Sequence, residues 1–323
     1  MSRRSRRKSK KQKKVKAEEV IVEKSGKKKQ NYFLNLYEKK YKLLLLIPII
    51  MLVLALSQLG LQTAFTGDFI NKGVSLKGGT TITIPTETYI DLVNLKNNLI
   101  EQLPEVDFSV RSLASAGNVV GVIIDADIKD KQTSDQLIKI LESETGVKKK
   151  EFGIETIESS LGESFFKETF TAVLIAFLFM GVVVFLYFRT FVPSMAVILA
   201  AFSDMVVTLA IINIMGIKLS TAGIAAFLML IGYSVDTDIL LSTRVLKREE
   251  GTVFERVLGA MKTGLTMNFS TMAAVLIGLM VAQSEVLRQI MMIIFIGLVV
   301  DIINTWIQNA GILRWYMEKK HNV

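Results

Sequence analysis

The sequence predicts a polytopic α-helical membrane protein with six transmembrane helices and one exported α+β ferredoxin-like domain between helices 1 and 2. The mean hydropathy is +0.42 and 50% of the residues are hydrophobic. Six apolar runs are each about as long as the ~20 residues that a helix needs to cross a bilayer core of about 30 Å. A polar region of about 100 residues separates the first run from the other five.

The first 42 residues form a basic tail. They contain 17 Lys and Arg against 4 Asp and Glu, whereas the rest of the chain has 22 basic and 26 acidic residues. A segment with this charge and few large apolar side chains is expected to be disordered. It lacks the apolar core and cleavage site of a secretory signal. We expect it to set topology and to bind anionic lipid rather than nucleic acid or ribosomes.

The apolar runs define the predicted spans. The first is 43–61, where Pro48 predicts a kink, and the other five are 170–188, 193–215, 221–241, 264–283 and 286–313. The predicted parts of the chain are therefore a tail 1–42, helix 1 at 43–61, the exported domain 62–167, a five-helix bundle 168–315 and a C-terminal tail 316–323.

Lysine and arginine residues near the span ends predict the orientation. The N-terminal tail, the connections 189–191 and 242–263 and the C-terminus carry many basic residues, whereas the two short opposite loops hold only Lys218 and Arg288. Both termini are therefore expected to be cytoplasmic in a multi-pass plasma-membrane protein. The polar region then lies on the outer face.

The polar region shows alternating strand and helix patterns. Leu92, Leu95, Leu99 and Leu103 share one helical face, with Thr88 as a possible cap. The predicted elements are strand 79–84, helix 89–103, strands 108–113 and 119–124, helix 134–144 and strand 147–157. The order β-α-β-β-α-β is typical of a split β-α-β, ferredoxin-like sandwich.

A capping box, Thr252-Val-Phe-Glu255, starts an apolar-periodic segment in the connection 242–263. It predicts a short helix along the cytoplasmic interface, or a helix packed on the bundle.

Residue types exclude several chemistries. The chain has no cysteine and one histidine, His321, in the C-terminal tail. Thiolate chemistry is therefore absent, and we expect no His-dependent catalysis, no metal site and no cofactor.

Four carboxylates fall within predicted spans: Asp204, Asp236, Asp238 and Asp301. Each would cost roughly 2.5–3.5 kcal/mol at a helix centre, so they should face a partner, a cavity or a proton path. We identify them as candidates for proton or ion coupling. Structural pairing in a hydrogen-bonded packing seam is the alternative.

Helical spacing separates two of these acids. Asp236 and Asp238 are two residues apart, about 200° around a helix, so they cannot share a face. Asp238 aligns with Ser234 and Ser242, whereas Asp236 lies on the side of Gly232 and Thr243. With Asn268 on the fifth span and Asn304 on the sixth, the serines predict a hydrated polar seam.

Two segments resemble the SecD/SecF branch of the RND superfamily. Gly73-Val-Ser-Leu-Lys-Gly-Gly-Thr80 is similar to the family's G-[IL]-D-[FL]-x-G-G element, with Ser75 replacing the aspartate and Gly73, Gly78 and Gly79 matching the glycines. Residues 231–245 resemble the family's signature span. There Asp236 matches the acid of the form V-D-A-N-V-L-I-F-E-R and Arg244 its closing arginine.

Other positions depart from the family pattern. The bacterial SecF form S-L-N-D-T-V-V places its acid at the position of Thr237. Asp204 matches the aspartate of a His-Asp pair in the third span, with Ser203 replacing the histidine. The single small domain, the short length and the basic tail resemble the SecF side of the family in an archaeal form.

The resemblance implies a non-enzymatic helper of protein export. Its implied partners are a SecD-like membrane protein, the Sec translocation channel and the secretory polypeptide, with proton flux as the energy source. The implied coupling acid is Asp236.

Two other classes remain open. A small-molecule exporter or permease of the RND type would need a longer or duplicated chain, or an oligomer. An intramembrane aspartyl protease could pair Asp204 with Asp236, but its Gly-x-Gly-Asp element is missing from the sequence.

Overall fold

The computed structural model describes residues 37–86, 90–115, 118–128, 130–247, 250–282 and 284–321. The chain divides into two units, Met1–Ile47 and Pro48–Val323. Most of the predicted basic tail, residues 1–36, lies outside the described residues and stays a prediction. The first unit contributes the short helix α2 (Tyr41–Leu44). All contacts described below belong to the second unit.

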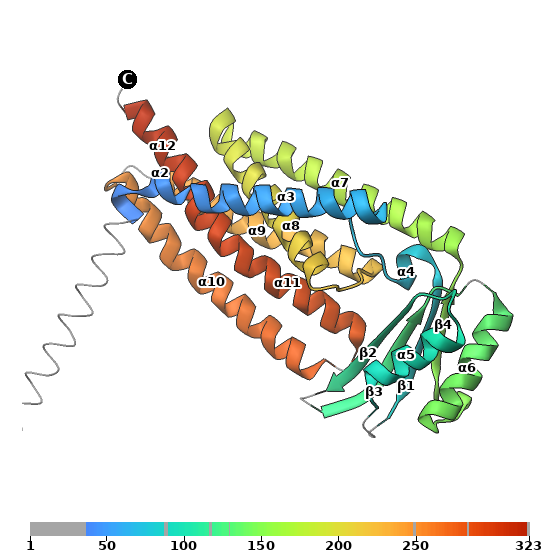
Figure 1. Cartoon of the computed structure of the whole chain (residues 1–323). Helices are drawn as coiled ribbons and strands as arrows, with labels where there is room; N and C mark the ends of the chain where they lie inside the picture. Colours follow the sequence, from blue (N-terminus) through green and yellow to red (C-terminus); the bar gives the residue numbers. More distant parts are fainter. Residues whose placement is uncertain are drawn as a thin grey trace, which may run out of the picture. The chain divides into compact units, whose positions relative to one another are not determined.

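Six helical segments of the described chain are long and apolar enough to cross a membrane, which confirms the predicted number. They are α3 (Leu46–Thr66), α7 (Ser159–Phe188), α8 (Phe191–Ile214), α9 (Thr221–Lys247), α10 (Val253–Val281) and a last run of α11 (Glu285–Ile303), the π-helix η2 (Asn304–Asn309) and α12 (Ala310–His321) (Figure 1). In α8 and α9, 56% of the apolar stretch is buried, against 11% in α7. These two helices are therefore the centre of the bundle.

Several helix ends differ from the prediction. Pro48, the position of the predicted kink, lies in the first turn of α3, where its missing N–H removes no helical hydrogen bond. The break in the helix is at Leu45, between α2 and α3. α7 begins at Ser159 rather than at 170, directly after the last strand. The predicted C-terminal tail 316–323 is helical as far as His321, because α12 continues into it.

The predicted interfacial helix after Thr252 is wrong, although its capping box is present. Thr252 Oγ1 accepts from the Glu255 N–H at 3.2 Å and Glu255 Oε2 accepts from the Thr252 N–H at 2.9 Å. The helix that this box starts is α10 itself, which runs unbroken to Val281. Since α9 also extends to Lys247, most of the segment 242–263 belongs to the two spans.

The polar region folds as an α/β domain with the predicted β-α-β-β-α-β order. The elements are β1 (Gly79–Pro85), α5 (Leu92–Gln102), β2 (Phe108–Ser115), β3 (Asn118–Ala126), α6 (Lys131–Thr145) and β4 (Gly153–Ile157). The sheet order is β2-β3-β1-β4, and all neighbours are antiparallel. This is the arrangement of a split β-α-β unit.

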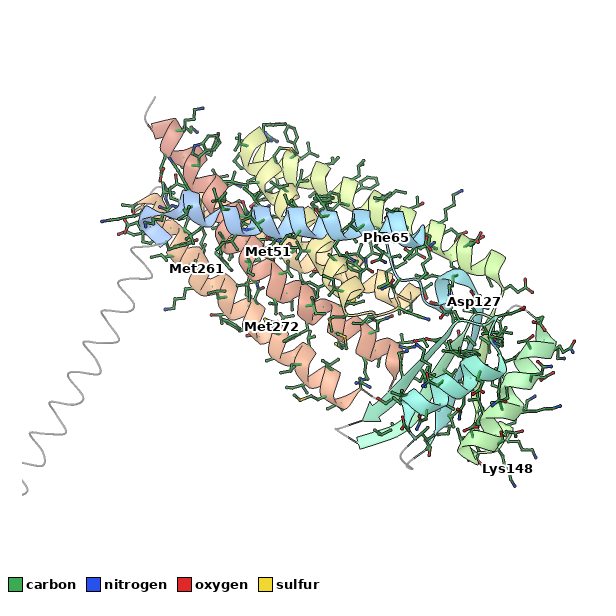
Figure 2. The ribbon with its side chains drawn as sticks, in the orientation of Figure 1. Met51, Phe65, Asp127, Lys148, Met261 and Met272 are labelled. Carbon is green, nitrogen blue, oxygen red and sulfur yellow. The ribbon has the colours of Figure 1, made fainter. Side chains whose placement is uncertain are left out.

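The core of this domain lies between the sheet and its two helices. Ile82 and Ile124 pair across β1 and β3 and are both fully buried, as are Leu99 of α5 and Leu141 of α6. The cap of α5 is Asp91, which accepts from the N–H groups of Val93 and Asn94. Thr88, the predicted cap, lies outside the described residues. Figure 2 shows the side chains, with Asp127 on the side of the domain towards α4 (Val74–Lys77) and Lys148 at its opposite end.

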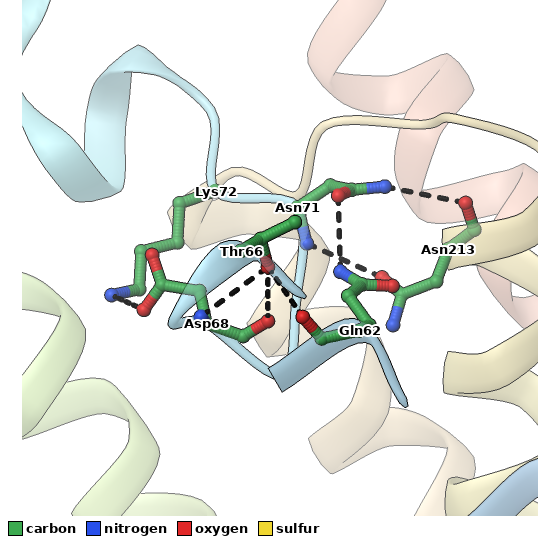
Figure 3. Close-up of polar contacts among 6 residues, drawn as sticks. All are labelled: Gln62, Thr66, Asp68, Asn71, Lys72 and Asn213. Atoms are coloured by element: carbon green, nitrogen blue, oxygen red, sulfur yellow. Dashed lines mark hydrogen bonds and ion pairs between the residues drawn. The ribbon is translucent and has the colours of Figure 1, made fainter. Parts of the chain in front are cut away.

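Hydrogen bonds connect the segment between α3 and the domain to the C-terminal end of α8 and the loop between α8 and α9. Asn71 donates from its backbone N–H to Asn213 Oδ1 and from Nδ2 to Asn213 O, each at 3.2 Å, and its Oδ1 accepts from Gln62 Nε2 at 3.0 Å (Figure 3). The Gly73 N–H donates to Leu219 O at 2.8 Å, and the Leu219 N–H donates to Asn71 O at 2.6 Å. The base of the domain is therefore fixed to the helical hairpin that contains α9.

Truncation of Leu99 should destabilise the α/β domain. Leu99→Ala removes a side chain with 0% exposure and is expected to cost about 2–5 kcal/mol of domain stability through lost burial and a cavity. Hydrogen exchange of the β1 and β3 amides in the full-length protein would measure this. Ile100→Ala, on the same helix but 42% exposed, is the control and should change protection little. Equal effects of the two substitutions would contradict the packing described here.

Candidate functional site

Three of the four predicted intramembrane carboxylates meet in the bundle. Asp204 comes from α8, Asp238 from α9 and Asp301 from α11, and each is fully buried. Burying a charge in an apolar medium is costly unless it is neutralised or hydrogen-bonded. The surroundings of these carboxylates therefore determine what they can do.

Neutral side chains supply hydrogen bonds to all three carboxylates. The contacts are Ser234 Oγ to Asp204 Oδ2 (2.5 Å), Asn304 Nδ2 to Asp204 Oδ1 (2.7 Å), Asn309 Nδ2 to Asp238 Oδ1 (2.7 Å) and Asn268 Nδ2 to Asp301 Oδ2 (2.8 Å). Asp301 also lies close enough to Ser234 and Asp204 to interact with them. The three acids thus form one connected network.

The Thr305 hydroxyl lies between two of the carboxyl groups. Its Oγ1 lies 3.0 Å from Asp238 Oδ1 and 2.9 Å from Asp301 Oδ1. A hydroxyl has one proton to donate. Both contacts are therefore favourable only when one of the two carboxyl groups carries a proton, or when a cation replaces that proton.

Positive side chains do not compensate the cluster. Within the described residues, no lysine or arginine forms an ion pair with any of the three acids. Several acceptor oxygens there also have no hydrogen-bond partner: Asp238 Oδ2, Asn304 Oδ1 and Asn309 Oδ1. The surplus of acceptors favours binding of protons, water or a small cation. In the described part of the chain, no group of three or more His, Cys, Asp or Glu has the arrangement of a metal site.

The π-helix η2 provides four of the polar side chains around the acids. Asn304, Thr305 and Asn309 bond to the carboxylates, and Gln308 Nε2 donates to Ser203 Oγ at 3.2 Å. π-helical segments are rare and occur mostly at functional sites.

Asp236 does not join the cluster. Its side chain is exposed on the outer face of α9, together with Gly232 and Tyr233. The structure therefore separates Asp236 from the other three candidate acids, because its two-residue offset from the buried Asp238 turns it away from the bundle. Without a protein partner, this carboxylate would face lipid.

Of the other predicted site residues, some contact the carboxylate cluster and others lie away from it. Ser234, Asn268 and Asn304 bond to the acids, and Ser242 is fully buried but its Oγ has no partner in the described chain. Arg244 stays apart from the cluster, because its Nη1 donates to Gly259 O and so joins α9 to α10.

Thr305, Gln308 and Asn309 were not predicted as site residues. The sequence contains a signal for them, because Asp301, Asn304, Thr305, Gln308 and Asn309 follow the spacing of one helical face within an apolar run.

The glycine element lies outside the membrane cluster but connects to it. Gly73 packs on the backbone of Leu219, and Gly79 has φ +125° with a virtual Cβ 2.6 Å from Ala126 O, so a side chain there would clash. Ser75, between them, accepts from the Thr221 N–H at the first turn of α9 (3.2 Å). It thereby caps the helix that carries Asp238.

Comparisons with known proteins agree on one family. The description "Protein export membrane protein SecD/SecF, C-terminal" matches residues 137–319. The protein-export membrane protein SecF of Methanocaldococcus jannaschii is 42% identical over 284 residues, which are 86% of this chain and 96% of that protein. SecF of Pyrococcus furiosus is 36% identical over 300 residues, which are 88% of this chain and 94% of that protein.

Solved structures show the same fold. The crystal structure of SecDF, a translocon-associated membrane protein from Thermus thermophilus, matches 88% of this chain with a TM-score of 0.69 at 20% identity. SecDF in a super-membrane-facing form matches 85% with a TM-score of 0.54 at 19% identity. This chain spans 38% of the length of either SecDF chain.

Close packing of α10 on η2 supports the cluster and is testable. A Cβ added at Gly264 would lie 2.3 Å from Trp306 Cζ2, whereas one at Gly232 would meet nothing within 4 Å. Alanine normally stabilises a helix by about 0.5–1 kcal/mol relative to glycine. Gly232→Ala should therefore leave the melting temperature equal or higher, and Gly264→Ala should lower it. A neutral or stabilising Gly264→Ala would show that Trp306 is not held against α10.

Proposed function

This chain belongs to the SecD/SecF family of protein-export membrane proteins, and on that premise we propose that it is a SecF-type auxiliary subunit of the Sec machinery. The observation that carries the proposal is the buried carboxylate network of Asp204, Asp238 and Asp301, in a chain that shares 42% identity with a SecF. All three acids are fully buried, which supports a role in energy transfer.

Protons are the proposed energy source. The Thr305 hydroxyl between Asp238 and Asp301 is satisfied when one proton is shared there. Loading or removing a second proton changes which contacts are favourable, and so changes how α9 packs on α11. One charge that crosses a 100 mV potential releases about 2.3 kcal/mol, enough to bias a two-state helix arrangement by nearly two powers of ten.

The α/β domain is the proposed output of this movement. The positive residues near the span ends favour cytoplasmic termini and a domain on the outer face of the plasma membrane. Ser75 caps the first turn of α9, and the segment around Asn71 and Gly73 is bonded to the loop before it. A shift of α9 would therefore reach the base of the domain without a flexible linker.

The free strand β4 is the proposed contact for the exported polypeptide. β4 forms one edge of the sheet, and its residues from Gly153 to Thr156 are exposed. An extended chain can add to such an edge through main-chain hydrogen bonds that do not depend on sequence. This suits a protein that handles many secretory chains.

The exposed face of α9 is the proposed contact for a SecD-like partner. Asp236 lies eight residues before Arg244, about 12 Å along the helix and well inside the bilayer core. A carboxylate that faced lipid at that depth would cost roughly 2.5–3.5 kcal/mol. A partner helix with a cationic or hydrogen-bonding side chain removes this cost.

Asp301→Asn should abolish the part of export that depends on the proton gradient. The amide keeps the size of the carboxyl group but cannot carry the exchangeable proton. Translocation in membrane vesicles, measured with and without a proton gradient, should show stimulation for the native protein and none for the variant. Asp135→Asn, an exposed carboxylate on α6, is the matched control. Undiminished stimulation in Asp301→Asn would reject proton coupling through this network.

Asp236→Leu should weaken the complex with the partner rather than the fold. The variant inserts and folds, since an apolar side chain replaces an exposed acid, but recovery of a SecD-like protein in affinity isolation should fall about tenfold or more. Leu178→Ala, on α7 with 65% exposure, changes another outward face and should leave recovery unchanged. If Asp236→Leu retains the partner at the native level, the interface lies elsewhere.

A further inference from the structure

An apolar cavity opens among four helices at the end of the spans next to the α/β domain. It has a volume of about 220 Å³, and all of its lining residues are apolar. Phe166 and Phe170 of α7, Phe202 of α8 and Phe227 of α9 contribute aromatic rings, and Ile70 closes it from the segment before the domain. A cavity without any polar group suits a hydrocarbon chain.

The mouth of this cavity faces the surroundings of the bundle. Leu174 and Phe202 both line it, yet their side chains are 54% and 37% exposed. Both residues lie inside membrane-spanning helices. The opening is therefore at the depth of lipid tails.

A polar cavity of about 480 Å³ adjoins the apolar one. Ile70 lines both, and the Lys72 ammonium lies 4.5 Å above the ring of Phe166, which lines the apolar cavity. Its other lining residues include Thr66, the last residue of α3, and Gly216 in the loop between α8 and α9. These chain ends place the polar cavity at the level of lipid headgroups.

Lysines outnumber acids in the polar cavity. Lys72, Lys77 and Lys218 line it, against Asp68 and Asp107. Lys72 is paired with Asp68 at 2.6 Å, but Lys77 and Lys218 share Asp107 at 3.7 and 3.6 Å, longer than a hydrogen bond. Asp107 is itself 65% exposed, and the Lys77 Nζ also forms an ion pair with, and donates a hydrogen bond to, Asp127 Oδ2 at 3.5 Å. Burial lowers the pKa of the Lys218 ammonium, and the nearby Asp107 carboxylate opposes this shift only in part.

We propose that the two cavities form one binding site for an anionic phospholipid, with its phosphate between Lys77 and Lys218 and one acyl chain between α7 and α8. The phosphate would give Lys77 and Lys218 closer contacts than the shared Asp107 provides, and the apolar cavity accepts only the hydrocarbon. Both features lie at the matching depths of one lipid molecule. The bound lipid would wedge between α7 and α8 below the segment that ties the domain to α9. This inference does not depend on the proposed role in export.

Native mass spectrometry of the full-length protein from nanodiscs would test the site. In mixed phosphatidylglycerol and phosphatidylcholine nanodiscs, we expect phosphatidylglycerol to be retained preferentially. The double variant Lys77→Gln/Lys218→Gln should lose about fivefold in retention for each lysine removed, as expected for basic groups at a lipid surface. Lys139→Gln/Lys148→Gln removes the same charge at exposed positions of the domain, with Lys148 at the end away from Asp127 (Figure 2), and should retain lipid normally.

Two further experiments distinguish a bound phospholipid from a free phosphate compound. Val173→Phe should fill the cavity and reduce retention of the long-chain lipid. Leu174→Phe should have the same effect from the exposed mouth of the cavity, where the larger side chain does not disturb the helix packing. Glycerol phosphate and inorganic phosphate should not compete with it. Equal retention of the two headgroups, equal retention by the two lysine double variants, or competition by free phosphate would each overturn the proposal. The basic tail is common to all variants, so its binding of lipid cancels in these comparisons.

Discussion

The packing of the bundle depends on keeping three carboxylates in an interior where no described lysine or arginine forms an ion pair with them. Asp204, Asp238 and Asp301 come from three different helices, so they can be satisfied only if α8, α9 and α11 stay in register. The amide and hydroxyl groups that bond to them are spread over α9, α10 and η2. A break in this register would leave a buried carboxylate without donors, which is far more costly than the loss of an apolar contact. The acids therefore determine how the helices pack.

Glycines that allow the helices to pack closely also hold the carboxylate network together. Gly264 faces the ring of Trp306, and Gly297 faces the side chain of Leu230, so each glycine lets a large side chain of the neighbouring helix lie directly against the helix backbone. Small residues at such crossings are typical of membrane helices, where packing rather than hydrophobic burial drives association. Here they bring Asn268 within 2.8 Å of Asp301.

Sequence patterns predicted the elements well and the site only in part. Apolar runs and strand alternation reflect length and periodicity, which are local, and so the six spans and the β-α-β-β-α-β order could be predicted. The helical offset between Asp236 and Asp238 correctly excluded a shared face, but it does not show which face is turned inward. The resemblance favoured Asp236, whereas packing buries Asp238. The π-helix and the continuity of α10 with its capping box also depend on tertiary contacts, which single-residue patterns do not encode.

The contact between Gly162 and Gly78 has a consequence for how the chain is assembled. A Cβ at Gly162 would lie 2.6 Å from Gly78 N, so the segment that leads into the α/β domain packs closely against the helix α7 that leads out of it. The α/β domain is thus an insertion between α3 and α7 whose two ends lie next to each other, and Gly78 and Gly162 are in contact at this point, the neck of the domain. A substitute module of quite different size could be grafted at this neck without altering the distance between α3 and α7.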